Sequence, residues 1–179
     1  MTPAPTIHVF TYKDGLLARL AHDLRLSLRR FEVLKSGTTI TGRFWPDSLV
    51  VDGVVERSGQ VDTRALSEAD RKKIVGNIAD EILLLARFPE AVFTGTVVAG
   101  GAGVEGSLTL VGKAAPVNVS VEAVDGRLRA NVTLVPSRWG IAPYRALAGA
   151  IKLQDRVVVR VAVPTDVPDP YTWSGPDHA

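Results

Sequence analysis

The sequence predicts a mainly β protein, an eight-stranded antiparallel barrel that carries one amphipathic helix. Two observations lead to this fold class. Most of the chain alternates apolar and polar residues with a period of two, which is typical of strands with one buried and one wet face. Only one long segment, residues 67–88, shows the helical period instead. Closing the sheet into a barrel removes its unpaired edges, and a β-sandwich with the helix across one end is the alternative.

Four strands are expected before the helix. The first covers residues 6–12. Strict alternation from Leu24 predicts the second strand, while residues 16–20 before it could instead begin a helical turn. The third strand covers residues 38–45, and the fourth follows a turn at Pro46. Each segment places its apolar side chains on one face.

The helix has a clear start and a clear stop. Ser67 is a plausible N-cap, and Asp70 lies three residues later, where a capping-box partner is expected. Pro89 ends the helix, because its ring clashes with the preceding turn. One apolar stripe is formed by Ile74, Ile78, Ile82 and Leu85. This stripe must pack on or in the β structure.

Closely spaced strands follow the helix, at residues 91–99, 104–111, 117–122, 128–134 and 156–164. Asp125-Gly126 is a strong hairpin signal, and Pro116 is expected to break the strand pattern. Residues 6–164 therefore form a single domain. The proline-rich residues 165–179 are expected to be a loose tail.

Composition excludes several kinds of site and partner. A formal net charge of +2 over 179 residues argues against a nucleic-acid-binding domain. The chain contains no cysteine, so disulfides and thiolate metal sites are excluded. No stretch approaches the 18 uninterrupted apolar residues typical of a membrane span, and the first residues lack a signal-peptide pattern. A soluble cytoplasmic protein without cofactor or metal is expected.

His22-Asp23 is the one polar pair that suggests acid–base chemistry. His8, on the first strand, is the other histidine that could join it in a metal site. A histidine at a strand entry more often makes a local hydrogen bond, so an enzyme is the weakest interpretation. The letters of GxGxxG occur at residues 101–106, but a strand follows where a dinucleotide site needs a helix.

Several segments, taken in order, resemble one known family. They are AHDLRLSLRRFEV at residues 21–33, ARFPEAVFTGTVV at 86–98, VEGSLTLVGKAAPVNVSV at 104–121 and SRWGIAP at 137–143. The chain is similar through these segments to the YceI-like family, the lipid- or polyisoprenoid-binding YceI-like domain. The resemblance implies a lipocalin-like barrel with the helix packed near its opening. It further implies a non-catalytic protein that holds an isoprenoid or other lipid, and it makes a homodimer a reasonable expectation.

A barrel interior lined by uncharged aliphatic residues suits an apolar chain. The expected ligand-binding residues are those that face inward on the strands, those that face the barrel on the helix, and two aromatic residues near an opening. They are Leu26, Leu28, Ile40, Phe44, Ile78, Ile82, Leu85, Phe93, Leu108, Leu110, Val119, Val132, Trp139, Tyr144 and Val159.

The same inward positions could equally form a filled core. The alternative function is then a structural or interaction module that docks a protein partner. Its contacts would come from the connection at residues 136–154, or from Tyr171 and Trp173 in the tail.

Overall fold

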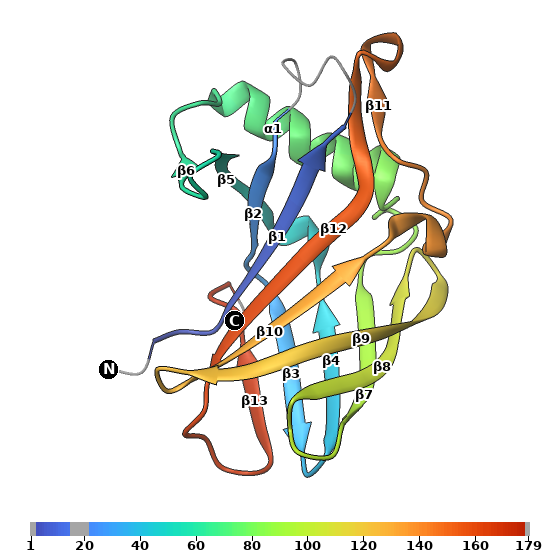
Figure 1. The fold of residues 1–179 in the computed structure, drawn as a ribbon. Helices are drawn as coiled ribbons and strands as arrows, with labels where there is room; N and C mark the ends of the chain where they lie inside the picture. Colours follow the sequence, from blue (N-terminus) through green and yellow to red (C-terminus); the bar gives the residue numbers. More distant parts are fainter. Residues whose placement is uncertain (1–2, 15–21, 178–179) are drawn as a thin grey trace.

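The computed structural model describes residues 3–14 and 22–177, so the possible helical turn at residues 16–20 lies outside the described residues. Within them, the chain forms one strongly bent antiparallel sheet and one α-helix (Figure 1). The strands are β1 (Thr6–Lys13), β2 (Leu24–Leu28), β3 (Phe31–Ser36), β4 (Thr39–Phe44), β5 (Leu49–Val55), β6 (Val61–Asp62), β7 (Ala91–Val97), β8 (Gly103–Leu110), β9 (Lys113–Val124), β10 (Arg127–Leu134), β11 (Arg145–Ala146), β12 (Ile151–Pro164) and β13 (Tyr171–Ser174). The helix is α1 (Glu68–Asn77), followed by the π-helical turn η2 (Ile78–Ile82). Short 3₁₀ turns are η1 (Pro46–Ser48), η3 (Pro136–Trp139) and η4 (Leu147–Gly149).

The sheet confirms a mainly antiparallel, barrel-like fold with one helix, but the described residues form thirteen strands where eight were expected. Its strand order is β13-β3-β4-β7-β8-β9-β10-β12-β1-β2-β5-β6, with β11 paired to β12. The hydrogen-bonded path ends at β13 and β6, so the described strands form an open barrel. The count differs partly because the single run expected from Leu24 breaks after Leu28 into β2 and β3.

The β9–β10 hairpin confirms the expected turn at Asp125-Gly126. Val124 pairs with Arg127, and the two turn residues have φ angles of 50° and 71°. Positive φ at both central positions is the geometry of a two-residue hairpin loop. By contrast, Pro116 does not break its strand, because β9 runs through it opposite Ser107 of β8. The pairing of β9 with β10 begins only at Ser120, so the missing N–H of Pro116 leaves no gap in that ladder.

The helix begins as expected and ends earlier. The Ser67 hydroxyl accepts from the Asp70 N–H, and the Asp70 carboxylate accepts from the Ser67 N–H, which completes the capping box. The expectation that the helix continues to Phe88 is wrong. After Asn77 the chain widens into the η2 turn, where the Leu83 N–H donates to the Ile78 carbonyl, and it reverses at Leu84 with a φ of 50°.

The expected loose tail is wrong for residues 171–174, which form β13 along the edge of β3. Trp173 pairs with Val33 and is only 4% exposed. Beyond β13, the Gly175 N–H donates to the Phe31 carbonyl, and Asp177 forms an ion pair with Arg29. The C-terminal segment therefore belongs to the sheet, and Trp173 is not available as a docking residue.

Candidate ligand-binding cavity

The bent sheet encloses a cavity of about 570 Å³. Its wall is built by the period-two pattern of the strands, because every second side chain points inward. On β10 these residues are Leu128, Ala130, Val132 and Leu134, and on β12 they are Val157, Val159, Val161 and Val163. The wall is therefore almost wholly aliphatic and aromatic, which is typical of a site for an apolar molecule.

The structure places fourteen of the fifteen expected residues on this wall. They are Leu26, Leu28, Ile40, Phe44, Ile78, Ile82, Phe93, Leu108, Leu110, Val119, Val132, Trp139, Tyr144 and Val159. Leu85 does not line the cavity, because the chain reverses at Leu84 before it can extend the helical stripe. That the fourteen bind a ligand stays a prediction.

Sequence reasoning missed several lining residues. Period-two alternation on β10 and β12 would have found Leu128, Val157, Val161 and Val163. It could not find Trp173, because this residue reaches the wall only through the pairing of β13 with β3.

Glycines allow aromatic rings to lie flat against the wall. A Cβ at Gly106 would lie 2.7 Å from Cζ of Phe93 and 2.4 Å from the Thr94 carbonyl, and one at Gly42 would lie 2.6 Å from Cζ of Phe44. Both distances to the rings are too short for a real side chain. Because these strands carry glycine there, the rings cover the sheet, and the middle of the barrel stays open.

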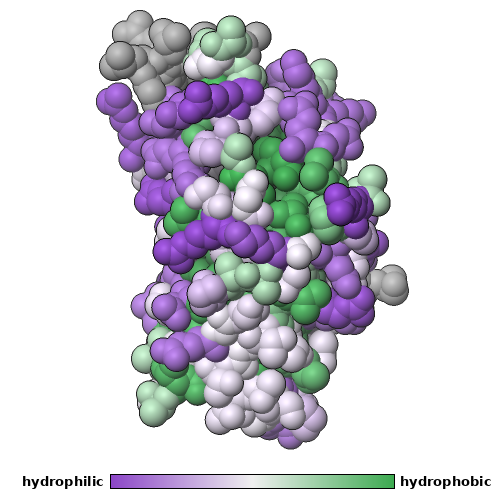
Figure 2. Space-filling view, turned by 90° about the vertical axis from the view of Figure 1, so that its right-hand side faces the viewer, coloured by the Kyte–Doolittle hydropathy of each residue, from purple (hydrophilic) through white to green (hydrophobic). Residues whose placement is uncertain are grey.

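One end of the cavity is closed by the end of the helix and the segment after η3. Ile78 and Ile82 of η2 line it together with Leu83, which follows η2, and residues 141–144 line it from the other side. The Asn77 amide donates to the Tyr144 hydroxyl over 2.8 Å and joins the two. Figure 2 views the molecule from the right-hand side of Figure 1, and hydrophobic residues are grouped in the upper half of that face. The helix thus lies at the end of the barrel where the chain segments cap it.

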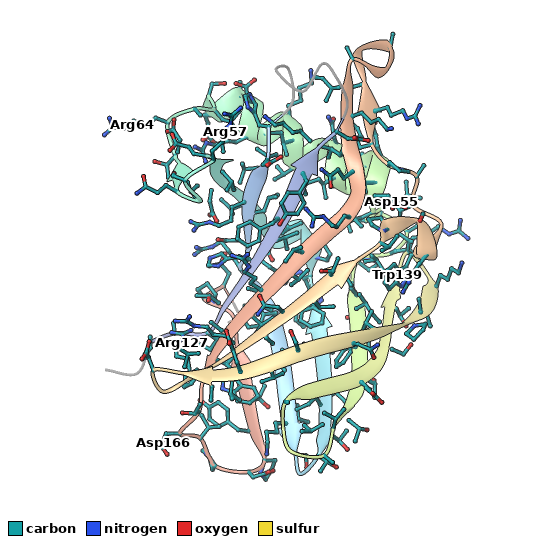
Figure 3. All side chains as sticks on the ribbon, in the orientation of Figure 1. Arg57, Arg64, Arg127, Trp139, Asp155 and Asp166 are labelled. Atoms are coloured by element: carbon teal, nitrogen blue, oxygen red, sulfur yellow. The ribbon has the colours of Figure 1, made fainter. Side chains whose placement is uncertain are left out.

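The η3 turn is held firmly at this end. The Trp139 indole N–H donates to the Leu108 carbonyl over 2.9 Å, and Trp139 is 3% exposed. The Ser137 N–H donates to the Asp155 carboxylate over 2.9 Å. Figure 3 shows Trp139 and Asp155 beside η3. These contacts fix one wall of the cavity near its cap.

Few polar side chains reach the cavity. Gln154 and Arg156 of β12 line it and are exposed, so the cavity reaches the surface beside this strand. Lys35 lines it near β13, and its ammonium donates to the Asp169 carboxylate. The hydrogen bonds from Lys35 and the Gly37 N–H lower the pKa of Asp169, so this carboxylate stays ionised beside the ammonium.

His22 and Asp23 do not line the cavity. Asp23 accepts a hydrogen bond from the Lys13 N–H over 2.8 Å, and His22 is exposed. In residues 3–14 and 22–177, no group of three or more His, Cys, Asp or Glu side chains is placed to hold a metal ion. Asp23, at the entry to β2, therefore makes a hydrogen bond to the β1 backbone.

His8 gives the fold a pH dependence. It alternates on β1 with the lining residues Ile7 and Val9, and burial and the nearby Arg25 guanidinium lower the pKa of its imidazole from 6.5. Because the imidazole binds its proton more tightly in the unfolded chain, the stability of the fold should fall as the pH drops below 6.5 toward the lower pKa of His8 in the folded protein.

Between about pH 7.5 and pH 5, we expect the melting temperature of His8→Gln to fall less than that of the wild type. Thermal unfolding across this range measures the difference. His22→Gln, at an exposed histidine, is the control, and equal losses in the wild type and both variants would contradict the assignment.

Comparisons with known proteins agree with this geometry. The family model of the YceI-like domain matches residues 24–164 of the chain. No curated protein matches it. Burkholderia cenocepacia BcnA has a similar structure, with a TM-score of 0.57 and 15% sequence identity over 88% of this chain and 94% of that chain. A polyisoprenoid-binding domain from Saccharophagus degradans, implicated in plant cell wall breakdown, has a TM-score of 0.53 and 11% identity over 98% and 96% of the two chains. The Campylobacter jejuni YceI protein has a TM-score of 0.52 and 11% identity over 80% and 85%.

At these identities the solved structures show the fold alone. Within the described residues, none of the helices combines the length and the apolar character that a membrane span requires.

Proposed function

The chain belongs to the YceI-like domain family, and we propose that it is a non-catalytic carrier that holds an apolar long-chain ligand inside its barrel. An isoprenoid or another lipid is the ligand class. The observation that carries the proposal is the apolar cavity of about 570 Å³. The likeness to a polyisoprenoid-binding domain of another organism supports the isoprenoid as the first ligand to test.

The cavity volume sets the size of the ligand. An apolar protein cavity of about 150 Å³ accommodates one benzene molecule, which has six carbon atoms. A cavity of about 570 Å³ is nearly four times larger, so it has room for a chain of roughly 20 carbon atoms. Burying roughly 400 Å² of such a chain at about 25 cal/mol/Å² gains on the order of 10 kcal/mol before the entropy losses of binding. Binding is therefore hydrophobic in origin.

The cavity also bears on the alternative, a filled barrel that docks a protein partner. A filled barrel leaves no cavity between its walls. If the tail docks a partner through Trp173, this side chain would also have to be exposed. Trp173 is 4% exposed and lines the cavity, which favours the carrier. A cytoplasmic location and a homodimer remain expectations for this carrier.

Native mass spectrometry of the purified protein, followed by solvent extraction, tests the proposal. We expect the protein to take up one equivalent of a C20 isoprenoid alcohol, and a long-chain lipid to co-purify from the host. The measurement is the mass of the complex and of the extracted molecule. Failure to take up any isoprenoid or alkyl chain of this length would contradict the carrier function.

A further inference from the structure

Two arginines on the outer face of the barrel have no carboxylate partner. Arg156 and Arg160 of β12 are exposed, and neither forms an ion pair with an Asp or Glu side chain of the described residues. Two strands away, on β2, Arg25 shows the contrast, because it forms an ion pair with Asp52. The positive charges of Arg156 and Arg160 are therefore available to a partner outside the chain.

Two aromatic rings of β1 hold these guanidiniums against the sheet. The guanidinium of Arg156 lies 4.1 Å from the centroid of the Tyr12 ring, and that of Arg160 lies 4.7 Å from the centroid of the Phe10 ring. β1 and β12 pair with each other, so both contacts join neighbouring strands (Figure 1). A cation–π contact uses the flat face of the guanidinium and leaves the N–H donors at its edge for a partner. We call these four residues the arginine face.

Carboxylates near the arginine face do not cancel its charge. Asp14, at the end of β1, forms an ion pair with Lys152. Asp23 accepts a hydrogen bond from the Lys13 N–H, and the side chain of Lys13 is itself exposed and adds a positive charge beside this carboxylate. The outer surface of β1 and β12 therefore carries an excess of positive charge, and an anionic partner fits it.

The chemistry of this face favours phosphate groups without bases. The edge of a guanidinium binds a phosphate through two parallel N–H donors. A single-stranded nucleic acid would also stack its bases on free aromatic rings, but Phe10 and Tyr12 are half-buried and already lie under guanidiniums. The net charge of +2 is also small for a nucleic-acid-binding domain. The phosphates of anionic lipids offer the charge without requiring a stacking surface.

Arg156 links the arginine face to the cavity. It lines the cavity and also stacks on Tyr12, and Gln154 beside it is a second exposed lining residue. An apolar chain of roughly 20 carbon atoms is driven out of water by the hydrophobic effect, so a bilayer is where a carrier would meet it. The unpaired positive charge thus lies beside the place where the cavity reaches the surface.

We propose that the arginine face docks the barrel on an anionic phospholipid surface, with Arg156 and Arg160 bound to lipid phosphates and the opening beside β12 at the membrane. The inference rests on the proposed carrier function and adds the surface from which the ligand is collected. Because the two arginines provide the attraction, docking depends on the charge of the lipid and weakens as salt screens it.

Binding to vesicles of defined composition tests this inference. The purified protein is mixed with phosphatidylcholine vesicles that contain or lack phosphatidylglycerol, and the bound fraction is measured by flotation. We expect the wild type to bind the anionic vesicles and to remain unbound with phosphatidylcholine alone. Replacing Arg156 and Arg160 together with glutamine should lower the affinity for anionic vesicles roughly ten- to thirtyfold, because two attractive charges are lost.

Two further variants separate the arginine face from net charge and from damage to the fold. Lys72 and Lys73 are exposed on α1, and changing both to glutamine removes the same charge elsewhere. This variant should bind anionic vesicles as the wild type does. Arg156→Lys with Arg160→Lys keeps both charges and should stay within about threefold of the wild-type affinity.

The outcomes distinguish the inference from the function on which it rests. Equal affinity of the wild type and the glutamine variant of the arginines would overturn the inference, and so would an equal loss in the Lys72 and Lys73 variant. Tighter binding of oligothymidylate than of anionic vesicles would assign the face to a nucleic acid and overturn it as well. Uptake of a C20 isoprenoid alcohol, measured separately, reports on the carrier function. Uptake without vesicle binding would leave the carrier and remove the docking surface, whereas vesicle binding without uptake would do the reverse.

Discussion

Replacing Ala130 and Val132 together with tryptophan is expected to reduce ligand uptake to less than about a tenth of the wild-type amount. Both residues line the cavity from β10, two positions apart on the same face. A benzene ring alone fills a cavity of about 150 Å³, and an indole is larger. Two indoles would therefore occupy more than half of the 570 Å³, and a long chain would no longer fit. Uptake of a C20 isoprenoid alcohol, measured by native mass spectrometry, gives the result.

The matched control places the same two side chains on the other face of the same strand. Arg129 and Thr133 flank the two cavity residues and are exposed. The double change of Arg129 and Thr133 to tryptophan should bind as much ligand as the wild type. Melting temperatures of both variants verify that they fold. A folded cavity variant that binds a full equivalent would show that the ligand does not occupy this space.

The pattern of the strands was sufficient to predict which side chains face inward. Leu26 and Leu28 on β2, and Val132 on β10, follow from alternation alone, because a strand has only two faces. The capping box of Ser67 and Asp70 was equally readable, since it depends on residues three positions apart. Interactions between near neighbours in the chain are thus within reach of sequence reasoning.

Whether the interior is hollow was not readable from the same pattern. Alternation selects a face, but the volume behind it depends on which residues meet across strands. Phe93 lies flat because Gly95 and Gly106, opposite each other on β7 and β8, both leave room for its ring, while Gly42, opposite Phe93 on β4, leaves room for the ring of Phe44. Strand register decides which residues lie opposite one another, and the register depends on the whole sheet. The burial of Trp173 is the same kind of fact, because β3 and β13 lie at opposite ends of the chain.

Replacing Trp173 with alanine is expected to lower the free energy of unfolding by about 3–5 kcal/mol. The indole is 4% exposed, and it makes an edge-type contact with the Tyr171 ring, with the two ring centroids 5.6 Å apart. Removing it leaves a void in the wall of the cavity, which Trp173 lines. Urea unfolding, followed by circular dichroism, measures the change in the free energy of unfolding.

The exposed neighbour Thr172 provides the comparison, because it lies on the same strand and points the other way. Thr172→Ala should change the free energy of unfolding by no more than about 0.5 kcal/mol. A loose tail would make the two substitutions equivalent, and deletion of residues 171–179 would then leave the barrel stable. If β13 is part of the sheet, the deletion must destabilise the barrel at least as much as Trp173→Ala does. It removes the same indole together with the hydrogen bond from the Gly175 N–H to the Phe31 carbonyl and the ion pair of Asp177 with Arg29.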